Sequence, residues 1–485
     1  MPNDGKLTLQ EILLVEDSPE ILSFKCPVTG WLAWPTVRQV FLSYLIHELA
    51  YEWPAFIGPV PTLWQHRRAG PALVKALRHN AEAVRRDVLR RPIMIFGTAS
   101  TIVDRDGRAV NRLSDDFALQ HAGNTVVIED LFPLQYSFPR NRLNPDVLYS
   151  LPDLVARQFR AAMINPAPFQ AVADGMTRFL TARVEQLFGL RIPSQRQVYM
   201  GALISKILRR YRIEQERFRR LFDKAKPRIL LVMAGTTGGP APAIQVARAM
   251  GIPVAEYQHG QSGAGQPEYN FAPTLLNSEA YRATLPDYLL AYGTWWIRRI
   301  NAPLQCLPIG NPHRTESLLR YRPAPRTGPP SILIVTKLGE AAKYLDLAGQ
   351  LDRHFDGRFR IQLRTNPRDQ DFGRHSTAQW QGRTIHLDNN PDFYASLPKA
   401  EILVSGPSTV LTESIGVASR IFIWDEVGGA FKYPEHIFER FGSVSELIEA
   451  LEVPPGDCPD RPDVAEVWAP DWRQRYSAFM DQFLT

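Results

Sequence analysis

The stretch Glu-Tyr-Gln-His-Gly at residues 256–260 follows a short apolar run and ends in a small, polar turn. Two later stretches have the same form: Ile-Gly-Asn-Pro-His at residues 309–313 and Ser-Gly-Pro-Ser-Thr-Val-Leu-Thr-Glu at residues 405–413. In open α/β sheets, ligands bind beyond the carboxyl ends of the strands, which is where such turns lie. Because the third stretch lies far along the chain from the other two, we expect two facing sheets with a cleft between them.

The length and composition predict a two-domain globular protein. A chain of 485 residues exceeds what one hydrophobic core usually supports, and 45% hydrophobic with 22% charged residues is an ordinary globular balance. Three scattered cysteines, Cys26, Cys306 and Cys458, form no metal-binding pair and favour a reducing compartment without structural zinc. No signal peptide is visible, and no run approaches the roughly 18 apolar residues of a membrane span. We expect a cytoplasmic protein, with peripheral association at the inner face of the cell membrane as an open alternative.

The net charge of +6 is concentrated in arginine-rich segments, above all residues 206–220. Two interpretations of that segment stay open: a solvated helix face, or a surface that meets anionic lipid or an anionic glycan. No nucleic-acid-binding motif accompanies the charge, so no nucleic-acid partner is expected.

Apolar periodicity predicts the fold class: α/β, with two Rossmann-like doubly wound domains facing a cleft. Strands are expected at residues 93–96, 125–128, 228–233, 253–257, 288–291, 305–309, 331–335, 360–363, 384–387, 401–404 and 420–424. Helices are expected at residues 37–51, 71–90, 151–222 (with breaks at 166–168 and 193), 242–250, 341–355, 391–397, 409–417, 443–451 and 471–483.

The expected domain boundary is the stretch 321–330, with four prolines. The N-terminal domain would span residues 1–320, with an aromatic-rich extension at its start and a helical insertion at about 150–225. The C-terminal domain would span residues 331–470. The last segment, 471–485, would be a helix suited to packing back on the N-terminal domain.

The turn at residues 405–409 is a candidate anion site. Ser405, Ser408 and Thr409 offer hydroxyls, and the start of the following helix offers backbone N–H groups. An ordinary helix cap is the alternative. Glu413, one turn into the helix, would accept hydrogen bonds from ribose hydroxyls or help to cap the helix.

Other candidate phosphate contacts end neighbouring strands. Arg364 or Arg368 would pair with a phosphate, and Lys337 offers a further positive charge; a charged surface loop is the alternative for each. His313, with Asn311 in the same motif, lies near the expected hinge and would face the donor phosphate or serve as a turn residue.

The candidate catalytic residues lie in the N-terminal half. His259 follows a buried strand and is a candidate general base or hydrogen-bond donor, while Glu256 would orient it or act as the base itself. Acceptor-side candidates are Gln258, the loop residues Gly238 and Gly239, and the acids Asp115 and Asp116, for which turn chemistry is the alternative.

With these motifs in view, the chain resembles GT-B glycosyltransferases that build bacterial surface polysaccharides. It is similar to the capsule and lipopolysaccharide group with Kdo transferases and polysialyltransferases, and more distantly to CDP-glycerol-type polyol phosphotransferases. The matching stretches are residues 256–260, 288–293, 309–313, 408–413 and 441–447, with a weaker match at 106–116. Members that use CMP-linked donors often carry a His-Pro pair, where this chain has Asn366-Pro367, leaving Arg364, Asn366 and Lys337 as substitutes.

The resemblance implies metal-independent transfer of a sugar from a nucleotide-sugar donor to a growing surface glycan or lipid-linked acceptor, with no cofactor. The C-terminal domain would bind the donor and stabilise the leaving phosphate through helix N-termini and basic groups. The N-terminal domain would hold the acceptor and supply the base. Three alternatives stay open: a CDP-polyol phosphotransferase of teichoic-acid type, a sugar-nucleotide 2-epimerase, and a non-catalytic scaffold of a polysaccharide assembly complex.

Overall fold

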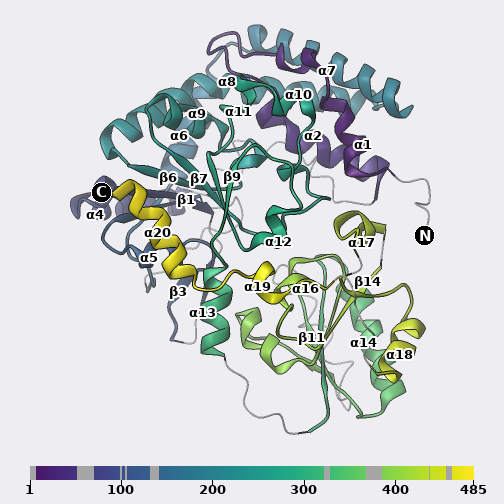
Figure 1. Ribbon diagram of the computed structural model, residues 1–485. Coiled ribbons are helices and arrows are strands. Elements are labelled where there is room, and N and C mark those ends of the chain that lie inside the picture. The colour runs from purple at the N-terminus through teal and green to yellow at the C-terminus, as the bar shows by residue number, and fades with distance from the viewer. Residues whose placement is uncertain are drawn as a thin grey trace.

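A computed structural model describes residues 7–51, 70–98, 101–103, 106–130, 141–321, 328–366, 385–425, 427–435, 437–454 and 461–484. The described chain forms two α/β lobes, each built on a parallel sheet (Figure 1). The prediction of two doubly wound α/β domains is therefore confirmed. Within the described residues, no helix is both long enough and apolar enough to span a membrane.

The first sheet has the strand order β5-β4-β1-β6-β7-β8-β9, and every neighbouring pair is parallel. Its strands are β1 (Ile93–Thr98), β4 (Thr125–Asp130), β5 (Val147–Tyr149), β6 (Ile229–Met233), β7 (Val254–Tyr257), β8 (Tyr288–Ala291) and β9 (Gln305–Pro308). A hairpin of β2 (Thr101–Val103) and β3 (Ala109–Asn111) follows β1, and Gly107 between them has a positive φ of 73°.

The second sheet has the order β12-β11-β10-β13-β14-β15 and is also parallel throughout. Its strands are β10 (Ser331–Val335), β11 (Arg360–Arg364), β12 (Ile385–Leu387), β13 (Ile402–Ser405), β14 (Arg420–Trp424) and β15 (Glu439–Phe441). The short edge strands β5 and β15 were not among the predicted strands, because three residues are too few to show a periodic pattern.

Helices cover both faces of each sheet, which is why the strands are apolar throughout rather than alternating. In the first sheet, Ile93 and Ile95 face a cluster with α20 (Trp472–Leu484), whereas their neighbour Met94 faces α8 (Ser194–Ala225) and α9 (Ala241–Ala249) on the other side. In the second sheet, Leu333 faces a cluster with α16 (Thr409–Glu413), and Ile332 faces α14 (Ala341–Phe355) and α18 (Val444–Glu452).

The helices of the N-terminal domain, with short 3-10 turns marked η, are α1 (Leu9–Leu13), η1 (Leu14–Glu16), η2 (Pro19–Leu22), α2 (Trp34–Leu49), α4 (Gly70–Arg85), η3 (Val88–Arg90), α5 (Asp115–Gln120), α6 (Leu151–Ala162), α7 (Ala167–Phe188), α8 (Ser194–Ala225), η4 (Gly235–Thr237), α9 (Ala241–Ala249), η5 (Pro267–Tyr269), α10 (Pro273–Leu276), α11 (Glu279–Arg282), α12 (Thr294–Ile297) and α13 (Pro312–Arg320). Those that follow are α14 (Ala341–Phe355), η8 (Phe393–Ala395), η9 (Leu397–Lys399), α16 (Thr409–Glu413), α17 (Val427–Lys432), α18 (Val444–Glu452), α19 (Val464–Val467) and α20 (Trp472–Leu484).

Two helix predictions are wrong in detail. The helix expected at residues 391–397 is a pair of short 3-10 turns, η8 and η9, because Pro398 supplies no N–H for a continuous helical hydrogen-bond series. The helix expected at residues 409–417 ends at Glu413, and Gly416 beyond it has a positive φ of 81°.

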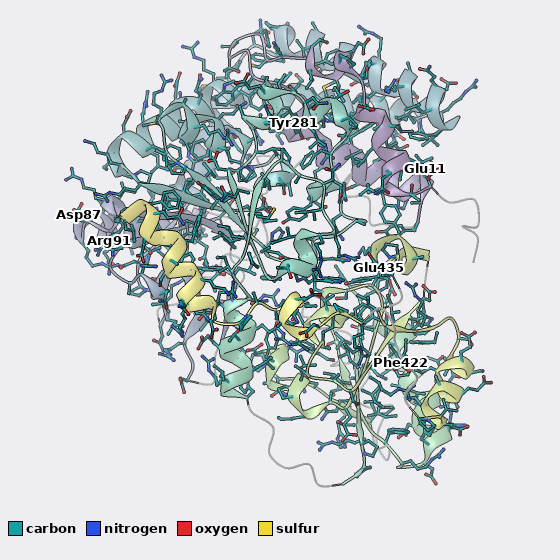
Figure 2. The ribbon with its side chains drawn as sticks, in the orientation of Figure 1. Glu11, Asp87, Arg91, Tyr281, Phe422 and Glu435 are labelled. Atoms are coloured by element: carbon teal, nitrogen blue, oxygen red, sulfur yellow. The ribbon has the colours of Figure 1, made fainter. Side chains whose placement is uncertain are left out.

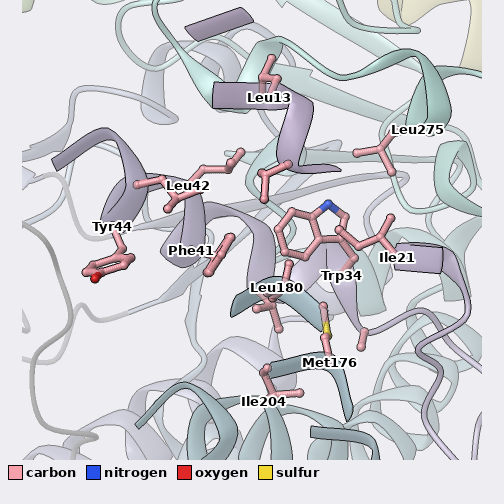
Figure 3. Close-up of a cluster of buried hydrophobic side chains, with 14 of the residues drawn as sticks. Leu13, Ile21, Trp34, Phe41, Leu42, Tyr44, Met176, Leu180, Ile204 and Leu275 are labelled. Atoms are coloured by element: carbon pink, nitrogen blue, oxygen red, sulfur yellow. The ribbon is translucent and has the colours of Figure 1, made fainter. Parts of the chain in front are cut away.

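The N-terminal extension forms its own core on top of the first sheet. Trp34 is fully buried among apolar side chains of α2, α7 and the preceding turns, as Figure 3 shows. Its indole N–H donates to Glu16 at 3.0 Å, and Glu16 also pairs with the buried Arg38 at 2.7 Å. Because both charges are buried and mutually satisfied, this ion pair fixes the extension on the domain rather than adding much stability.

The last helix, α20, belongs to the first domain although it follows the second in sequence. Trp472, Tyr476, Phe479 and Met480 join the cluster that includes Ile93 and other strand residues of the first sheet. In Figure 1, α20 is the yellow helix beside the upper lobe, near α5, whereas the yellow helix α18 lies in the lower lobe. The chain therefore crosses between the domains twice.

Candidate functional site

The two domains touch where the loop after β7 meets α17. A Cβ atom placed on Gly265 would lie 2.2 Å from the carbonyl oxygen of Phe431, so the two backbones are in direct contact. The side chain of Gln261 also donates to the carbonyl oxygen of Lys432 at 3.2 Å. Beside this contact, Arg299 of the first domain pairs with Glu435 of the second, which Figure 2 labels at the boundary between the lobes. These contacts bring the carboxyl edges of both sheets together.

His259 follows β7 at this boundary. The residue keeps part of its surface exposed, while its Nδ1 is buried without a hydrogen-bond partner. Burial lowers the pKa of His259 to about 4, so the imidazole is neutral near pH 7 and has a nitrogen lone pair that can accept a proton. The next residue, Gly260, approaches the other domain: a Cβ placed on it would lie 3.8 Å from Cγ2 of Thr409.

The turn after β13 places Ser408 and Thr409 opposite His259, whereas Ser405 is occupied. The Ser405 side chain is fully buried and donates to the carbonyl oxygen of Val335 at 2.9 Å. Ser408 is the N-cap residue of α16, yet its hydroxyl makes no capping hydrogen bond to the helix. Because α16 has only five residues, its dipole is small, and the turn contributes hydroxyls and N–H groups rather than a helix field.

Two lysines supply the positive charge near this turn. Lys337 follows β10 and pairs through its Nζ with Glu340 at 2.8 Å, and a Cβ placed on Gly406 would lie 2.6 Å from its Cδ. Lys432 ends α17 at the boundary contact described above. Burial, and then the charge of Lys337, lower the pKa of Lys432 to about 8, which shows that the two ammonium groups act on each other.

Lys432 was not among the residues selected from the sequence. It ends the short helix α17, which contains Gly428 and Gly429, and such a segment carries no strand or helix pattern. Only the tertiary fold brings it next to Lys337.

Arg364 is committed to an ion pair within its own domain. Its Nη1 donates to Asp388 at 2.7 Å and to the carbonyl oxygen of Asn390 at 2.8 Å. Both side chains of the pair are almost fully buried. We therefore assign Arg364 to the support of the β11–β12 edge and not to phosphate binding. Asn366 lies beside it, where its backbone N–H donates to Thr336 Oγ1 at 3.0 Å; Pro367 and Arg368 lie outside the described residues.

Asn311 and His313 belong to the connection between the domains rather than to a turn. Asn311 is the N-cap of α13 and accepts a hydrogen bond from the N–H of Arg314 at 3.1 Å. His313 is buried between the domains, 3.9 Å from Asp116 and 3.7 Å from Asp392. Burial acts to raise the pKa of Asp392, but the charge interaction with His313 and the hydrogen bond from the backbone N–H of Tyr394 outweigh it, so the pKa lies below its usual value.

Glu413, which the sequence offered for ribose recognition, lies in the same region. It is partly exposed at the end of α16, and Arg314 donates to its carbonyl oxygen at 3.2 Å. Burial, followed by the charge of Glu413, raises the pKa of the neighbouring Tyr394 well above its usual value. The side chain thus sits beside the boundary, where it faces Tyr394 and Tyr292.

Glu256 is a positioning residue and not an exposed base. It is fully buried, and its carboxyl group accepts hydrogen bonds from the N–H of Thr236 at 2.9 Å and from the hydroxyl of Tyr269 at 2.8 Å. Burial raises its pKa to about 7. Gln258 has a similar structural role: it is buried, accepts from the N–H of Tyr292 at 2.7 Å and donates to the carbonyl oxygen of Gly260 at 2.8 Å.

The acceptor-side candidates from the N-terminal half are separated. Gly238 has a φ of 84°, and a Cβ there would lie 1.6 Å from the carbonyl oxygen of Pro35, so this glycine is required for packing. Gly239 is exposed and lines a cavity. Asp115 is fully buried, accepts from the N–H of Asn111 at 2.8 Å and, through burial, has its pKa raised to about 7.

Within the described part of the chain, no three His, Cys, Asp or Glu side chains are grouped so that they would hold a metal ion. The candidate site comprises His259 from one domain and Ser408, Thr409, Lys337 and Lys432 from the other. This set can accept a proton on one side of the boundary and stabilise negative charge on the other.

The sequence matches no protein-family model and no curated protein. Among solved structures, the chain is similar to UDP-GlcNAc 2-epimerase of Methanocaldococcus jannaschii in complex with UDP-GlcNAc and UDP, at 13% identity and a TM-score of 0.44, covering 80% of this chain and 99% of that one. The UDP-GlcNAc 2-epimerase of Neisseria meningitidis is similar at 11% identity and a TM-score of 0.44, covering 81% of this chain and 99% of that one. Acinetobacter baumannii MurG is similar at 10% identity and a TM-score of 0.38, covering 81% of this chain and 99% of that one. With TM-scores below 0.5, the fold class rests on the two parallel sheets themselves.

Proposed function

We propose that this protein is a metal-independent glycosyltransferase that moves a sugar from a nucleotide-sugar donor to a growing surface glycan. The observation that supports this proposal best is a close approach across the domain boundary. Gly260, the residue after His259, lies so near Thr409 that a Cβ placed on it would be 3.8 Å from the Thr409 Cγ2. A proton acceptor and a polar, positively charged turn then face the same space from opposite domains. Transfer between two substrates held by two domains requires that arrangement.

In the proposed reaction, the neutral imidazole of His259 takes the proton of an acceptor hydroxyl as its oxygen attacks the anomeric carbon of the donor. The bond between that carbon and the phosphate oxygen breaks, and the nucleotide leaves with the electron pair. Lys337 and Lys432 stabilise the charge on the leaving phosphate, and the hydroxyls of Ser408 and Thr409 donate hydrogen bonds to it. Closure of α17 on the loop after β7 excludes water, which would otherwise compete with the acceptor.

Donor binding also adjusts the base. A pKa of about 4 makes the empty-site imidazole neutral but weakly basic. The negative charge of a bound diphosphate nearby favours the imidazolium, so the pKa of His259 rises toward the range of an efficient base when the donor is present. The same phosphate raises the pKa of Lys432, which burial and Lys337 lower in the empty site.

Isothermal titration with UDP, GDP, CDP, CMP, ADP and dTDP, first without and then with magnesium, tests the donor half of this proposal. We expect one nucleotide to bind without metal, and Lys432→Gln to weaken it by about tenfold or more, the size of a charge-assisted contact. Lys399→Gln is the matched control, because that lysine is exposed in the same domain. Absence of binding to every nucleotide would overturn the proposal.

The nucleotide that binds indicates the class of donor, and the products of the reaction identify its type. Selective binding of UDP, GDP or dTDP favours a hexose donor, and CMP favours Kdo-like or sialic-acid-like donors. Incubation with the donor and fragments of bacterial surface glycans should release the nucleotide only when an acceptor is present. Release of CMP with transfer of a polyol phosphate would instead identify a CDP-polyol phosphotransferase, and inversion of the donor sugar without an acceptor would identify an epimerase.

A further inference from the structure

A cavity of about 440 Å³ lies in the first domain at the carboxyl ends of β4, β1 and β6. Its apolar part is formed by Phe96, Ile128 and Phe218. Its polar part includes Arg157 of α6, together with Arg210 and Arg217 of α8. The volume is within the range of small-molecule sites, roughly 300 to 1,000 Å³.

Not every arginine of this cavity has an acidic partner. Arg157 pairs with Glu214 at 2.7 Å, and Arg217 pairs with Asp153 at 3.2 Å. Arg210 has no ion-pair or hydrogen-bond partner among the described residues, although it is largely buried. The Nε atoms of Arg157 and Arg210 are both buried without an acceptor. An unpaired, partly desolvated guanidinium is costly unless an anion joins it.

The surroundings add further positive charge. Burial, followed by the charges of Arg210 and Arg209, lowers the pKa of Lys206 to about 8. Among the acids that line the cavity, Glu214 is already paired, and Asp130 accepts a hydrogen bond from the Ser150 hydroxyl at 2.9 Å. The lining therefore carries three arginines against two carboxylates, Asp130 and Glu214, beside an apolar wall.

We propose that this cavity binds an acidic sugar, with its carboxylate or phosphate on Arg210 and Arg157 and its ring against Phe96 and Phe218. The identity of this ligand as the acceptor rests on the glycosyltransferase proposed above. The strand order supports that role: β6, which ends in the cavity, is the neighbour of β7, which ends at His259. Strands lie roughly 4.8 Å apart, so an acceptor one or two residues long spans from the cavity to the base.

The test compares two arginines of the same helix that lose the same charge. Arg210→Gln removes the unpaired guanidinium, whereas Arg212→Gln removes one that is 67% exposed and pairs with Glu216 at 3.2 Å. Isothermal titration uses glucose 6-phosphate, glucuronate and glucose as probes. We expect at least one acidic sugar to bind and glucose not to bind. Arg210→Gln should weaken the acidic sugar by about tenfold or more, and Arg212→Gln by no more than about twofold.

A second readout separates binding from folding. Because Arg210 is an unpaired buried charge, Arg210→Gln should leave the melting temperature of the empty protein unchanged or higher, and abolish the increase caused by the acidic sugar. Equal effects of the two substitutions, equal binding of glucose, or no binding of any probe would overturn the proposal. Binding of phosphatidylglycerol vesicles that weakens equally in both variants, without acidic-sugar binding, would overturn it in favour of a membrane-facing helix.

Nucleotide titrations on the same proteins distinguish this inference from the proposed function. If the wild type binds acidic sugar through Arg210 but binds no nucleotide, the cavity is a real site and the glycosyltransferase proposal fails. If it binds a nucleotide and no acidic sugar, the glycosyltransferase proposal stands and the cavity proposal fails.

Discussion

Gly265→Ala should separate the two domains without disturbing either core. The added methyl group would lie 2.2 Å from the carbonyl oxygen of Phe431 and 3.0 Å from Cα of Lys432. Ordinary contact begins near 3.4 Å, so the two backbones must move apart by about 1.2 Å, the difference between 3.4 and 2.2 Å. Both neighbours are backbone atoms, so no side-chain rotation relieves the clash.

A displacement of that size matters for a reaction shared between domains. A misplacement of about 1 Å can cost on the order of 100-fold in rate, which corresponds to about 2.7 kcal/mol of transition-state stabilisation. We expect kcat/KM for transfer to fall by about that factor. Nucleotide affinity should also weaken, because Lys432 moves with α17. Small-angle scattering should show a larger radius of gyration for the variant.

Gly263→Ala is the matched control. It adds the same methyl group to the same loop, where the nearest atom is Nε of Arg299 at 3.5 Å, an ordinary contact. If Gly265→Ala and Gly263→Ala have the same kcat/KM, nucleotide affinity and radius of gyration, then the closed contact is not part of the working enzyme and the reasoning is refuted.

Three further substitutions test the base, the buried acid and the N-terminal extension. His259→Gln should lower the transfer rate by about 10²- to 10⁴-fold with nucleotide affinity retained in titrations; a rate within threefold, roughly, of the wild type would remove His259 from catalysis. Glu256→Gln should change the pH dependence of urea unfolding. The pKa of Glu256 is about 7 in the folded protein and 4.5 for the free group, so folding favours the neutral acid. This contribution to the free energy of unfolding is fully present at pH 4.5 and below, and about 3 kcal/mol of it is lost as the pH rises to 7 and above. That loss of stability should be absent from Glu256→Gln. If the unfolding free energies of the wild type and the variant instead change with pH in parallel, the carboxyl group of Glu256 does not have a raised pKa. Gly238→Ala should lower the free energy of unfolding by at least about 3 kcal/mol, through a positive φ and a clash with Pro35, whereas Gly239→Ala should have little effect because its nearest contact is at 3.8 Å; equal stability of the two variants would contradict this packing.

The sheets were predictable because parallel strands covered on both faces have continuous apolar runs. Residues 288–291, 331–335 and 420–424 match β8, β10 and β14 residue for residue. The elements that escaped prediction were short or depended on distant partners. Helix α17 contains Gly428 and Gly429, and its place is decided by packing against Tyr51 of the N-terminal extension.

The residues of the candidate site were likewise predictable from the sequence only in part. His259 and the Ser408–Thr409 turn were visible because each ends an apolar run at a sheet edge, where the fold class places ligands. The partner of Arg364 was not visible, because Asp388 follows the next strand, β12, and the intervening sequence gives no sign of the pairing. The isolation of Arg210 was equally hidden: every arginine of residues 206–220 looks alike until Glu214 and Glu216 are seen to pair with others.

The return of α20 to the first domain sets the order in which the protein is built during synthesis. Residues 331–454 all leave the ribosome before Trp472, Tyr476, Phe479 and Met480, which cover Ile93 and Ile95. The second domain is therefore complete while one face of the first sheet is covered only in part, by α4 and α5. The domain that begins first finishes last, and a chain stopped a few residues short of α20 exposes the apolar surface that recruits chaperones and promotes aggregation.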